Sequence, residues 1–222
     1  MKRAMTLLEV LIATSIFVIV IGLAFGVSGR TSSNVGETLV ISDVAMKSNR
    51  LAEYLNQYLR SAQSYTLTAT AAPNTAFTAV EFRTITGYDF DGLDPDGVTE
   101  NNGIERSPVR LIRFVYDAGE DSTNGADDDG DGLIDEGSIE LREDLNNDGD
   151  ATDANELLAV LATNVDADSF SIQCQPSGGA TPAVDDAFLQ ISYTIMRRLP
   201  RQGEIYTFTN NLEIAFRNSL SN

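Results

Sequence analysis

The stretch Met5-Thr6-Leu7-Leu8-Glu9-Val10-Leu11-Ile12-Ala13 opens the segment that decides the fold of this chain. Glu9 stands at its start, and no charged residue follows between Val10 and Gly29. An uncharged run of this length is sufficient for one helical membrane span. A charged side chain at the centre of such a span costs about 2.5 to 3.5 kcal/mol on insertion scales. Glu9 is therefore a candidate functional residue.

The same helix is predicted to continue beyond the apolar run. From Gly29 to about Tyr65 the chain contains no proline and only one further glycine, Gly36. Apolar residues recur there at spacings near three and four, which is typical of a helix packed on a domain. These residues are Val35, Leu39, Val40, Val44, Leu51, Leu55, Tyr58 and Leu59. We predict one helix from about Met5 to Ser64, with a transmembrane part over residues 5–30 and an amphipathic part over 31–65. Gly22 and Gly26 are its expected weak points.

Beyond Pro73 the hydrophobic pattern changes to a period of two, which predicts β-strands. A helix followed by antiparallel strands predicts an α+β fold in which the sheet covers the apolar face of the helix. The β-rich head is expected over residues 66–222, with acidic insertions at 87–103 and 117–156. The expected strands are 77–85, 109–116, 138–142, 169–173, 187–197 and 205–216, the last two as a hairpin around Pro200–Gly203.

Composition limits the possible functions. The 222 residues include 33 acidic and 15 basic ones, for a formal net charge of −18, which argues against a nucleic-acid-binding surface. Histidine, the commonest general base and transition-metal ligand, is absent, so we do not expect an enzyme. The single cysteine, Cys174, cannot form an intramolecular disulfide and is expected to be a buried apolar residue.

The N-terminus, with Met1-Lys2-Arg3-Ala4 before Met5 and Glu9, resembles that of type IV pilins and type II secretion pseudopilins. The resemblance implies that prepilin peptidase removes the basic leader, residues 1–4, and methylates Met5. Glu9 would then be the fifth residue of the mature chain and would offset the α-ammonium of a neighbouring subunit. Ala4 stands where the family usually has glycine. The segments Leu158–Val165 and Asn210–Asn218 are most similar to PilW-like minor pilins and J-type pseudopilins.

This resemblance implies a structural subunit of a type IV pilus or a type II secretion pseudopilus, whose partners are other pilin-like subunits and an inner-membrane assembly platform. Lys2 and Arg3 predict a cytoplasmic N-terminus and an extracytoplasmic head. Two alternatives for the N-terminal segment are a secretory signal peptide and a plain membrane anchor. Alternatives for the whole chain are a calcium-dependent adhesive pilin at a filament tip and an anchored hydrolase, for which no sequence motif argues.

The middle of the chain is strongly acidic, with 22 of the 33 carboxylates between Asp89 and Glu156. Its densest stretch, Gly125–Gly137, reads GADDDGDGLIDEG and matches the first half of an EF-hand-type calcium loop. Oxygen ligands without His or Cys favour calcium over zinc or copper. The candidate ligands are Asp127, Asp129, Asp131, the carbonyl of Leu133, Asp135 and Glu136. Ser138 occupies the twelfth position, where an EF-hand has a glutamate, so Glu136, Glu140 or a more distant acid would have to replace it.

A second stretch repeats this spacing with candidate ligands Asp144, Asn146, Asp148 and Asp150, and Asp153 or Glu156 would complete it. The first stretch resembles the acidic repeats of thrombospondin type 3 and dockerin modules. A third cluster contains Asp89, Asp91, Asp94 and Asp96 at irregular spacing. The alternative for all three is a solvated acidic loop without an ion. The first stretch is expected at a hairpin tip because strands are predicted on both sides of it.

Overall fold

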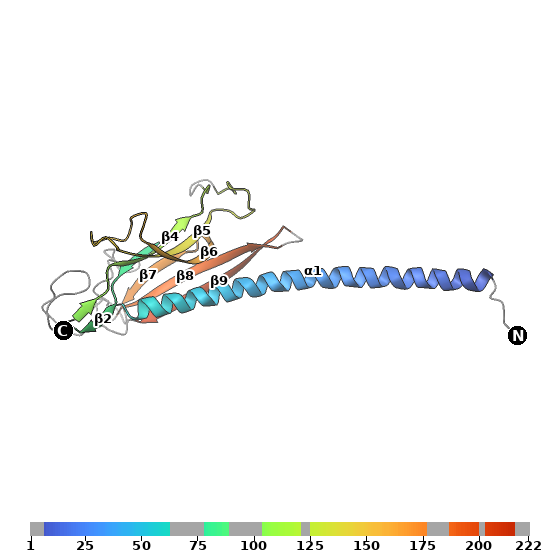
Figure 1. Ribbon diagram of the computed structural model, residues 1–222, viewed down its shortest axis with the longest axis horizontal. Coiled ribbons are helices and arrows are strands. Elements are labelled where there is room, and N and C mark those ends of the chain that lie inside the picture. The colour runs from blue at the N-terminus through green and yellow to red at the C-terminus, as the bar shows by residue number, and fades with distance from the viewer. Residues whose placement is uncertain are drawn as a thin grey trace.

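Helix α1, Leu7–Arg60, forms a 54-residue rod that extends far beyond the rest of the molecule (Figure 1). The computed structural model describes residues 7–62, 78–88, 104–120, 125–176, 187–199 and 203–215. The helix was predicted to reach Ser64 but ends at Arg60, because Ala62 leaves it to form an antiparallel bridge with Thr84. The predicted start at Met5 lies outside the described residues.

The N-terminal half of α1 projects away from the described parts of the head (Figure 1). All residues from Leu7 to Gly29 are exposed, and they cover about 35 Å of helix at 1.5 Å per residue. The helix runs without interruption through Gly22 and Gly26, the two predicted weak points. It is long and apolar enough to cross a membrane, a property shared by membrane anchors and by signal sequences near an N-terminus.

The C-terminal half of α1 is part of the hydrophobic core. Val44, Ser48, Leu51, Leu55 and Leu59 are buried and lie on one face of the helix at spacings of three and four residues. Val40 is half-buried, but the prediction was wrong for Val35 and Leu39, which are 52% and 65% exposed. At about 100° per residue, they lie roughly 180° and 140° around the helix from Val44, on the side opposite the buried face.

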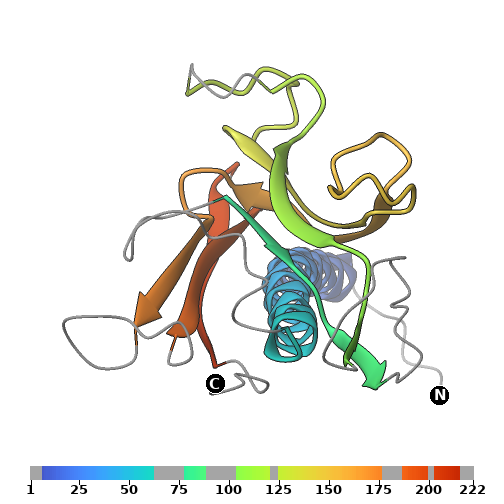
Figure 2. The same ribbon diagram turned by 90° about the vertical axis from the view of Figure 1, so that its left-hand side faces the viewer.

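An antiparallel seven-stranded sheet covers this half of the helix, which confirms the predicted α+β fold (Figure 2). Its strand order is β1-β4-β5-β6-β8-β7, and β9 also pairs with β8. The strands are β1 (Ala79–Phe82), β4 (Arg110–Tyr116), β5 (Glu136–Glu143), β6 (Leu157–Asp166), β7 (Ser171–Pro176), β8 (Ala187–Arg198) and β9 (Ile205–Ala215). A separate pair joins β2 (Ile85–Tyr88) to β3 (Ile104–Arg106).

Most predicted strands are confirmed to within a few residues, including the β8–β9 hairpin. The strand predicted over 77–85 is divided, because the bridge of Thr84 to Ala62 separates β1 from β2. β5 begins at Glu136, two residues before its predicted start. The sequence pattern did not predict β3 or β6 as strands, and it did not predict β2 beyond Ile85. The predicted burial of Cys174 concerns a side chain outside the described ones.

A buried polar cluster joins the helix to the sheet. The Tyr193 hydroxyl, on β8, donates a hydrogen bond of 2.8 Å to the main-chain carbonyl of Ser48 on α1. Asn210, on β9, donates from Nδ2 to the Tyr193 hydroxyl (3.2 Å) and to Ser48 Oγ (3.3 Å). Ser48 and Tyr193 are fully buried, so these bonds stand in place of lost water contacts and fix the position of the helix along the sheet.

Candidate metal centres

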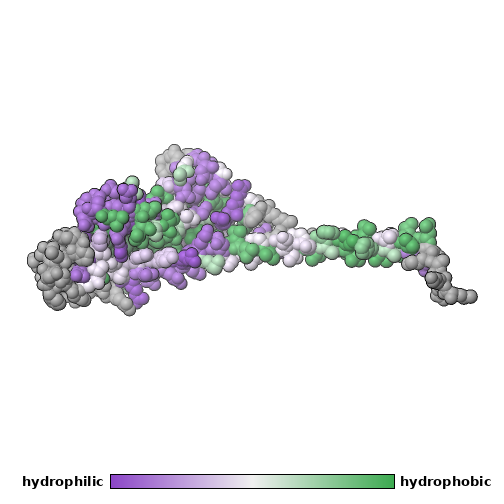
Figure 3. Space-filling model, viewed as in Figure 1, coloured by the Kyte–Doolittle hydropathy of each residue, from purple (hydrophilic) through white to green (hydrophobic). Residues whose placement is uncertain are grey.

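Two acidic loops occupy adjoining strand connections in the head. Loop A, residues 117–135, joins β4 to β5, and the described parts are 117–120 and 125–135. It lies at a hairpin tip, as predicted, since Tyr116 pairs with Gly137 at the base of the loop. Loop B, residues 144–156, joins β5 to β6. In the space-filling view the head surface near the two loops is mainly hydrophilic (Figure 3).

In loop A the alternate aspartates curl the chain around their own carboxylates. Asp127 accepts main-chain hydrogen bonds from Gly130 (2.7 Å) and Gly132 (2.9 Å). Asp129 Oδ1 accepts one from Asp131 at 2.9 Å. Gly132 has a positive φ of 92°, a conformation that glycine adopts without strain. A Cβ at this position would also collide with the guanidinium of Arg198, which lies against the loop.

Loop B has the same local conformation. Asp144 accepts from the N–H groups of Asn147 (2.7 Å) and Gly149 (3.0 Å), as Asp127 does from Gly130 and Gly132. Asn146 Oδ1 accepts from Asp148 at 2.9 Å, in the place of the Asp129 contact. Because these bonds span only two to five residues, the Asp-x-Asp/Asn-x-Asp-Gly spacing alone produces the curl.

Glu120 supports loop A from outside the acidic motif. Its Oε1 accepts hydrogen bonds from the N–H groups of Asp128 and Asp129 (3.1 Å each), and its Oε2 accepts one from Asp135 (3.3 Å). Glu120, Asp127 and Asp129 each place a carboxylate oxygen within 4.8 Å of the other two. Sequence spacing did not indicate Glu120, because its position beside the motif depends on how the hairpin closes.

Glu136, the first residue of β5, is the most unusual acid of the head. Its side chain is 0% exposed, and neither carboxylate oxygen has a hydrogen-bond partner. Burial raises its pKa to about 7. The main chain of Glu136 itself offsets part of this rise in pKa, and the carboxylates of Asp131, Glu120 and Asp129 add to it. The carboxylates of Asp129, Asp131 and Glu136 form a second group with oxygens within 4.8 Å of one another.

Gly137 explains how Glu136 enters the interior. A Cβ at Gly137 would collide with the main-chain carbonyl of Val115 and with the ring of Phe114. Only glycine lets β5 approach β4 this closely, and the preceding residue is thereby drawn into the head.

Ser138 and Glu140 both have partners elsewhere. Ser138, at the twelfth position, donates from Oγ to Asp117 Oδ1 at 2.8 Å. Glu140, one of the two acids named as a substitute ligand, forms ion pairs with Arg113 (3.4 Å) and Arg142 (3.1 Å) on the sheet. The other, Glu136, is the one that the fold brings to Asp129 and Asp131.

The remaining predicted ligands of loop A lie beside the two groups. Leu133 is buried, and its N–H donates to Asp131 Oδ1 at 2.8 Å. Asp135 has a φ of 49° and a buried, unpartnered Oδ1, but it belongs to neither group of three carboxylates. Its main-chain carbonyl accepts a hydrogen bond from Ala167 (3.0 Å), which attaches the loop to the turn between β6 and β7.

In loop B, Asp144, Asp148 and Glu156 place carboxylate oxygens within 4.8 Å of one another. Both oxygens of the buried Glu156 accept main-chain hydrogen bonds, from Leu145 (3.3 Å) and Asp153 (2.8 Å). Hydrogen bonds from the side chain and the N–H of Thr152 lower the pKa of Asp150, a predicted ligand that does not belong to this group.

Two side chains, those of Asn146 and Arg142, donate further hydrogen bonds within loop B. Asn146 Nδ2 donates to Asp148 Oδ2 (3.0 Å) and to Asp153 Oδ2 (2.8 Å). The buried Arg142 donates to the carbonyls of Ala151 (2.8 Å), Thr152 (3.2 Å) and Asp153.

The remaining predicted sites lie outside loops A and B. Ala4, Met5 and the third acidic cluster (Asp89, Asp91, Asp94 and Asp96) lie outside the described residues. Glu9 lies in the first turn of α1.

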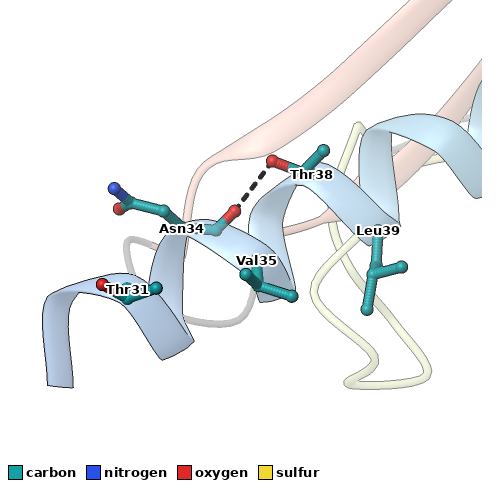
Figure 4. Close-up of a pocket in the computed structure, with 5 residues that line it drawn as sticks. All are labelled: Thr31, Asn34, Val35, Thr38 and Leu39. Carbon is teal, nitrogen blue, oxygen red and sulfur yellow. Dashed lines mark hydrogen bonds between the residues drawn. The ribbon is translucent and has the colours of Figure 1, made fainter. Parts of the chain in front are cut away.

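A hollow of about 290 Å³ occurs farther along the helix and is lined by Thr31, Asn34, Val35, Thr38 and Leu39 (Figure 4). Within it Thr38 Oγ1 donates to the carbonyl of Asn34 at 2.8 Å, and the lining contains amide, hydroxyl and apolar groups.

A scan against protein-family models finds no match to this chain, and searches of curated proteins and of solved structures find no significant match either.

Proposed function

We propose that this chain is a minor pilin or pseudopilin, a structural subunit of a type IV pilus or a type II secretion pseudopilus. The observation that carries the proposal is the division of α1 into an exposed apolar half and a half that forms the core of a β-sheet head (Figure 3). A bare apolar rod of about 35 Å is unfavourable in water, so it requires lipid or the apolar helices of other subunits. The head then remains outside the cytoplasm while the rod lies in the inner membrane or in the centre of a filament.

The N-terminal residues supply the assembly chemistry of this proposal. Prepilin peptidase cleaves after Ala4 and methylates Met5, and the assembly platform transfers the processed chain to the filament. Glu9 lies in the first turn of α1, where a carboxylate is favoured by the helix macrodipole, and would be the fifth residue of the processed chain. In the filament its charge offsets the α-ammonium of a neighbouring subunit, which removes the cost of an isolated carboxylate among apolar side chains.

The acidic loops have a separate role in the proposed function: they bind calcium after export and make the head rigid. The support is the gathering of three carboxylates at each of three positions in loops A and B. An ion that binds the folded head and not the unfolded chain adds its binding energy to stability.

Mass spectrometry of the mature chain tests the processing step. In cells that contain prepilin peptidase, we expect an N-terminal methylated Met5. A mature N-terminus inside the apolar run, for example after Gly26, would identify a secretory signal peptide and contradict the proposal. An uncut chain in the membrane would identify a plain anchor.

Filament incorporation tests the role of Glu9. We expect Glu9→Gln to reach the inner membrane but to be missing from sheared filaments. Glu53→Gln provides the matched control, because Glu53 is an exposed acid on the same helix, beside the head. Equal incorporation of the Glu9→Gln variant and the wild type would show that Glu9 has no assembly role.

A further inference from the structure

We propose that the head holds one calcium ion, bound in loop A between Asp129, Asp131 and Glu136, and that loop B is a calcium-independent copy closed by the protein's own hydrogen bonds. This inference rests on the calcium role proposed above and assigns it to one of the candidate positions. It also replaces the twelfth-position glutamate of an EF-hand loop with Glu136, at the tenth.

The buried carboxylate of Glu136 needs a positive charge beside it when it is ionised. A fully buried carboxylate without a hydrogen-bond donor is strongly destabilising when it is ionised. Arg113 and Arg142 pair with Glu140, and Arg110 pairs with Glu143 at 2.6 Å, so these three cations are engaged on the sheet. A bound cation would supply the missing positive charge directly.

Asp129 and Asp131 of loop A lie close to the carboxylate of Glu136. Asp129 and Asp131 each use Oδ1 to accept a main-chain hydrogen bond, at 2.9 and 2.8 Å. Both side chains lie on the exposed surface of the loop, while Glu136 approaches the same point from the interior. The three carboxylates therefore surround a position between the loop and the start of β5, where hard oxygen ligands suit calcium.

Glu120 acts as a positioning residue in this arrangement. Its three hydrogen bonds to the N–H groups of Asp128, Asp129 and Asp135 hold both ends of the curled segment. The loop is thus shaped before an ion arrives, which lowers the entropic cost of binding.

Loop B differs because donors of the protein occupy its carboxylates. Glu156, unlike Glu136, has a main-chain donor on each oxygen. The amide of Asn146 lies between Asp148 and Asp153, and its orientation follows from Oδ1, which accepts the N–H of Asp148. The amide nitrogen takes the place of a cation between these two carboxylates. Asp129 occupies the equivalent position in loop A and has no amide to donate.

Calorimetric titration of the full chain in detergent micelles with calcium, after removal of ions by a chelator, tests this assignment. We expect one ion per chain for the wild type. Glu136→Gln should weaken binding at least about tenfold, or ~1.4 kcal/mol. Asp148→Asn is the matched control in loop B and should bind calcium as the wild type does.

Thermal unfolding in chelator shows whether Glu136→Gln still folds. We expect its Tm to equal or exceed that of the wild type, because a neutral amide is less costly to bury than a carboxylate. Unchanged calcium binding by Glu136→Gln, two ions per chain, or lost binding in Asp148→Asn would overturn the assignment while leaving a calcium role in place. No binding by the wild type at millimolar calcium would overturn both the assignment and the calcium role.

Discussion

Replacement of Tyr193 by phenylalanine tests how the head is held on its helix. The substitution removes one hydroxyl group and leaves the ring in the core. It deletes the 2.8 Å hydrogen bond to the Ser48 carbonyl and the contacts that the hydroxyl accepts from Asn210 (3.2 Å) and Ser48 Oγ (3.5 Å). Asn210 keeps its 3.3 Å bond to Ser48 Oγ, so one donor remains satisfied. We therefore expect a loss of about 1 to 2 kcal/mol in the free energy of unfolding.

Chemical and thermal unfolding of the full chain in micelles measures this loss. For a domain of about 150 to 250 residues, each kcal/mol lowers Tm by roughly 2 to 4 °C. Tyr54→Phe is the matched control, because it removes the same hydroxyl group from an exposed tyrosine on α1, the helix that Tyr193 of β8 contacts. A loss in Tyr193→Phe no larger than that in Tyr54→Phe would refute the role of the buried cluster in joining helix and sheet.

The alkaline stability of the two variants provides a second readout. Burial raises the pKa of Tyr193 above its usual 10.0, and hydrogen bonds with Ser48 and Asn210 offset part of this shift. The folded state therefore holds the phenolic proton more tightly than the unfolded state. Its contribution to stability is complete below about pH 10 and is lost as the pH rises through the raised pKa. We expect stability to fall less steeply above pH 10 in Tyr193→Phe, whereas Tyr54→Phe should follow the wild type.

Three further substitutions test the core, the loops and the base of loop A. Leu55→Ala should lower the free energy of unfolding by about 2 to 5 kcal/mol, because Leu55 is fully buried. Leu39→Ala, at an exposed position of the same helix, should leave it nearly unchanged. Equal losses of the two variants in urea titration would contradict the observed buried face of the helix. The pKa of Glu136 is raised from 4.5 to about 7, so the folded head holds this proton more tightly than the unfolded chain does. In chelator, the free energy of unfolding should therefore fall by at most about 3 kcal/mol as the pH rises from about 5 to about 8 and the proton is lost. Glu136→Gln should remove this step, and persistence of the step would assign it to another group. Gly137→Ala should lower Tm by several degrees, because its Cβ would collide with the Val115 carbonyl and the Phe114 ring; Gly22→Ala, in the open part of α1, should not lower it.

Features that depend on short stretches of chain could be predicted from the sequence. The uncharged run after Glu9 indicated the exposed rod, and the two-residue period indicated β4, β8 and β9. The helix pattern was less reliable for Val35 and Leu39, because their spacing of four residues places them together but on the side of the helix opposite Val44. The division of β1 from β2 was missed because the bridge of Ala62 to Thr84 joins segments that are not neighbours in sequence.

The curl of both acidic loops follows from local sequence alone. Asp127 and Asp144 form their hydrogen bonds with N–H groups three and five residues ahead, so spacing and two glycines suffice. Which further acids lie beside these loops depends on tertiary packing. Glu120 contacts loop A because the β4–β5 hairpin closes, and Glu136 is buried where β5 packs closely on β4 at Gly137. The same holds for Ser48 and Tyr193, which are 145 residues apart and come together only when the sheet closes over the helix. Local hydrogen bonding is encoded in spacing, whereas contacts across elements depend on how apolar faces pack, and that is a property of the whole chain.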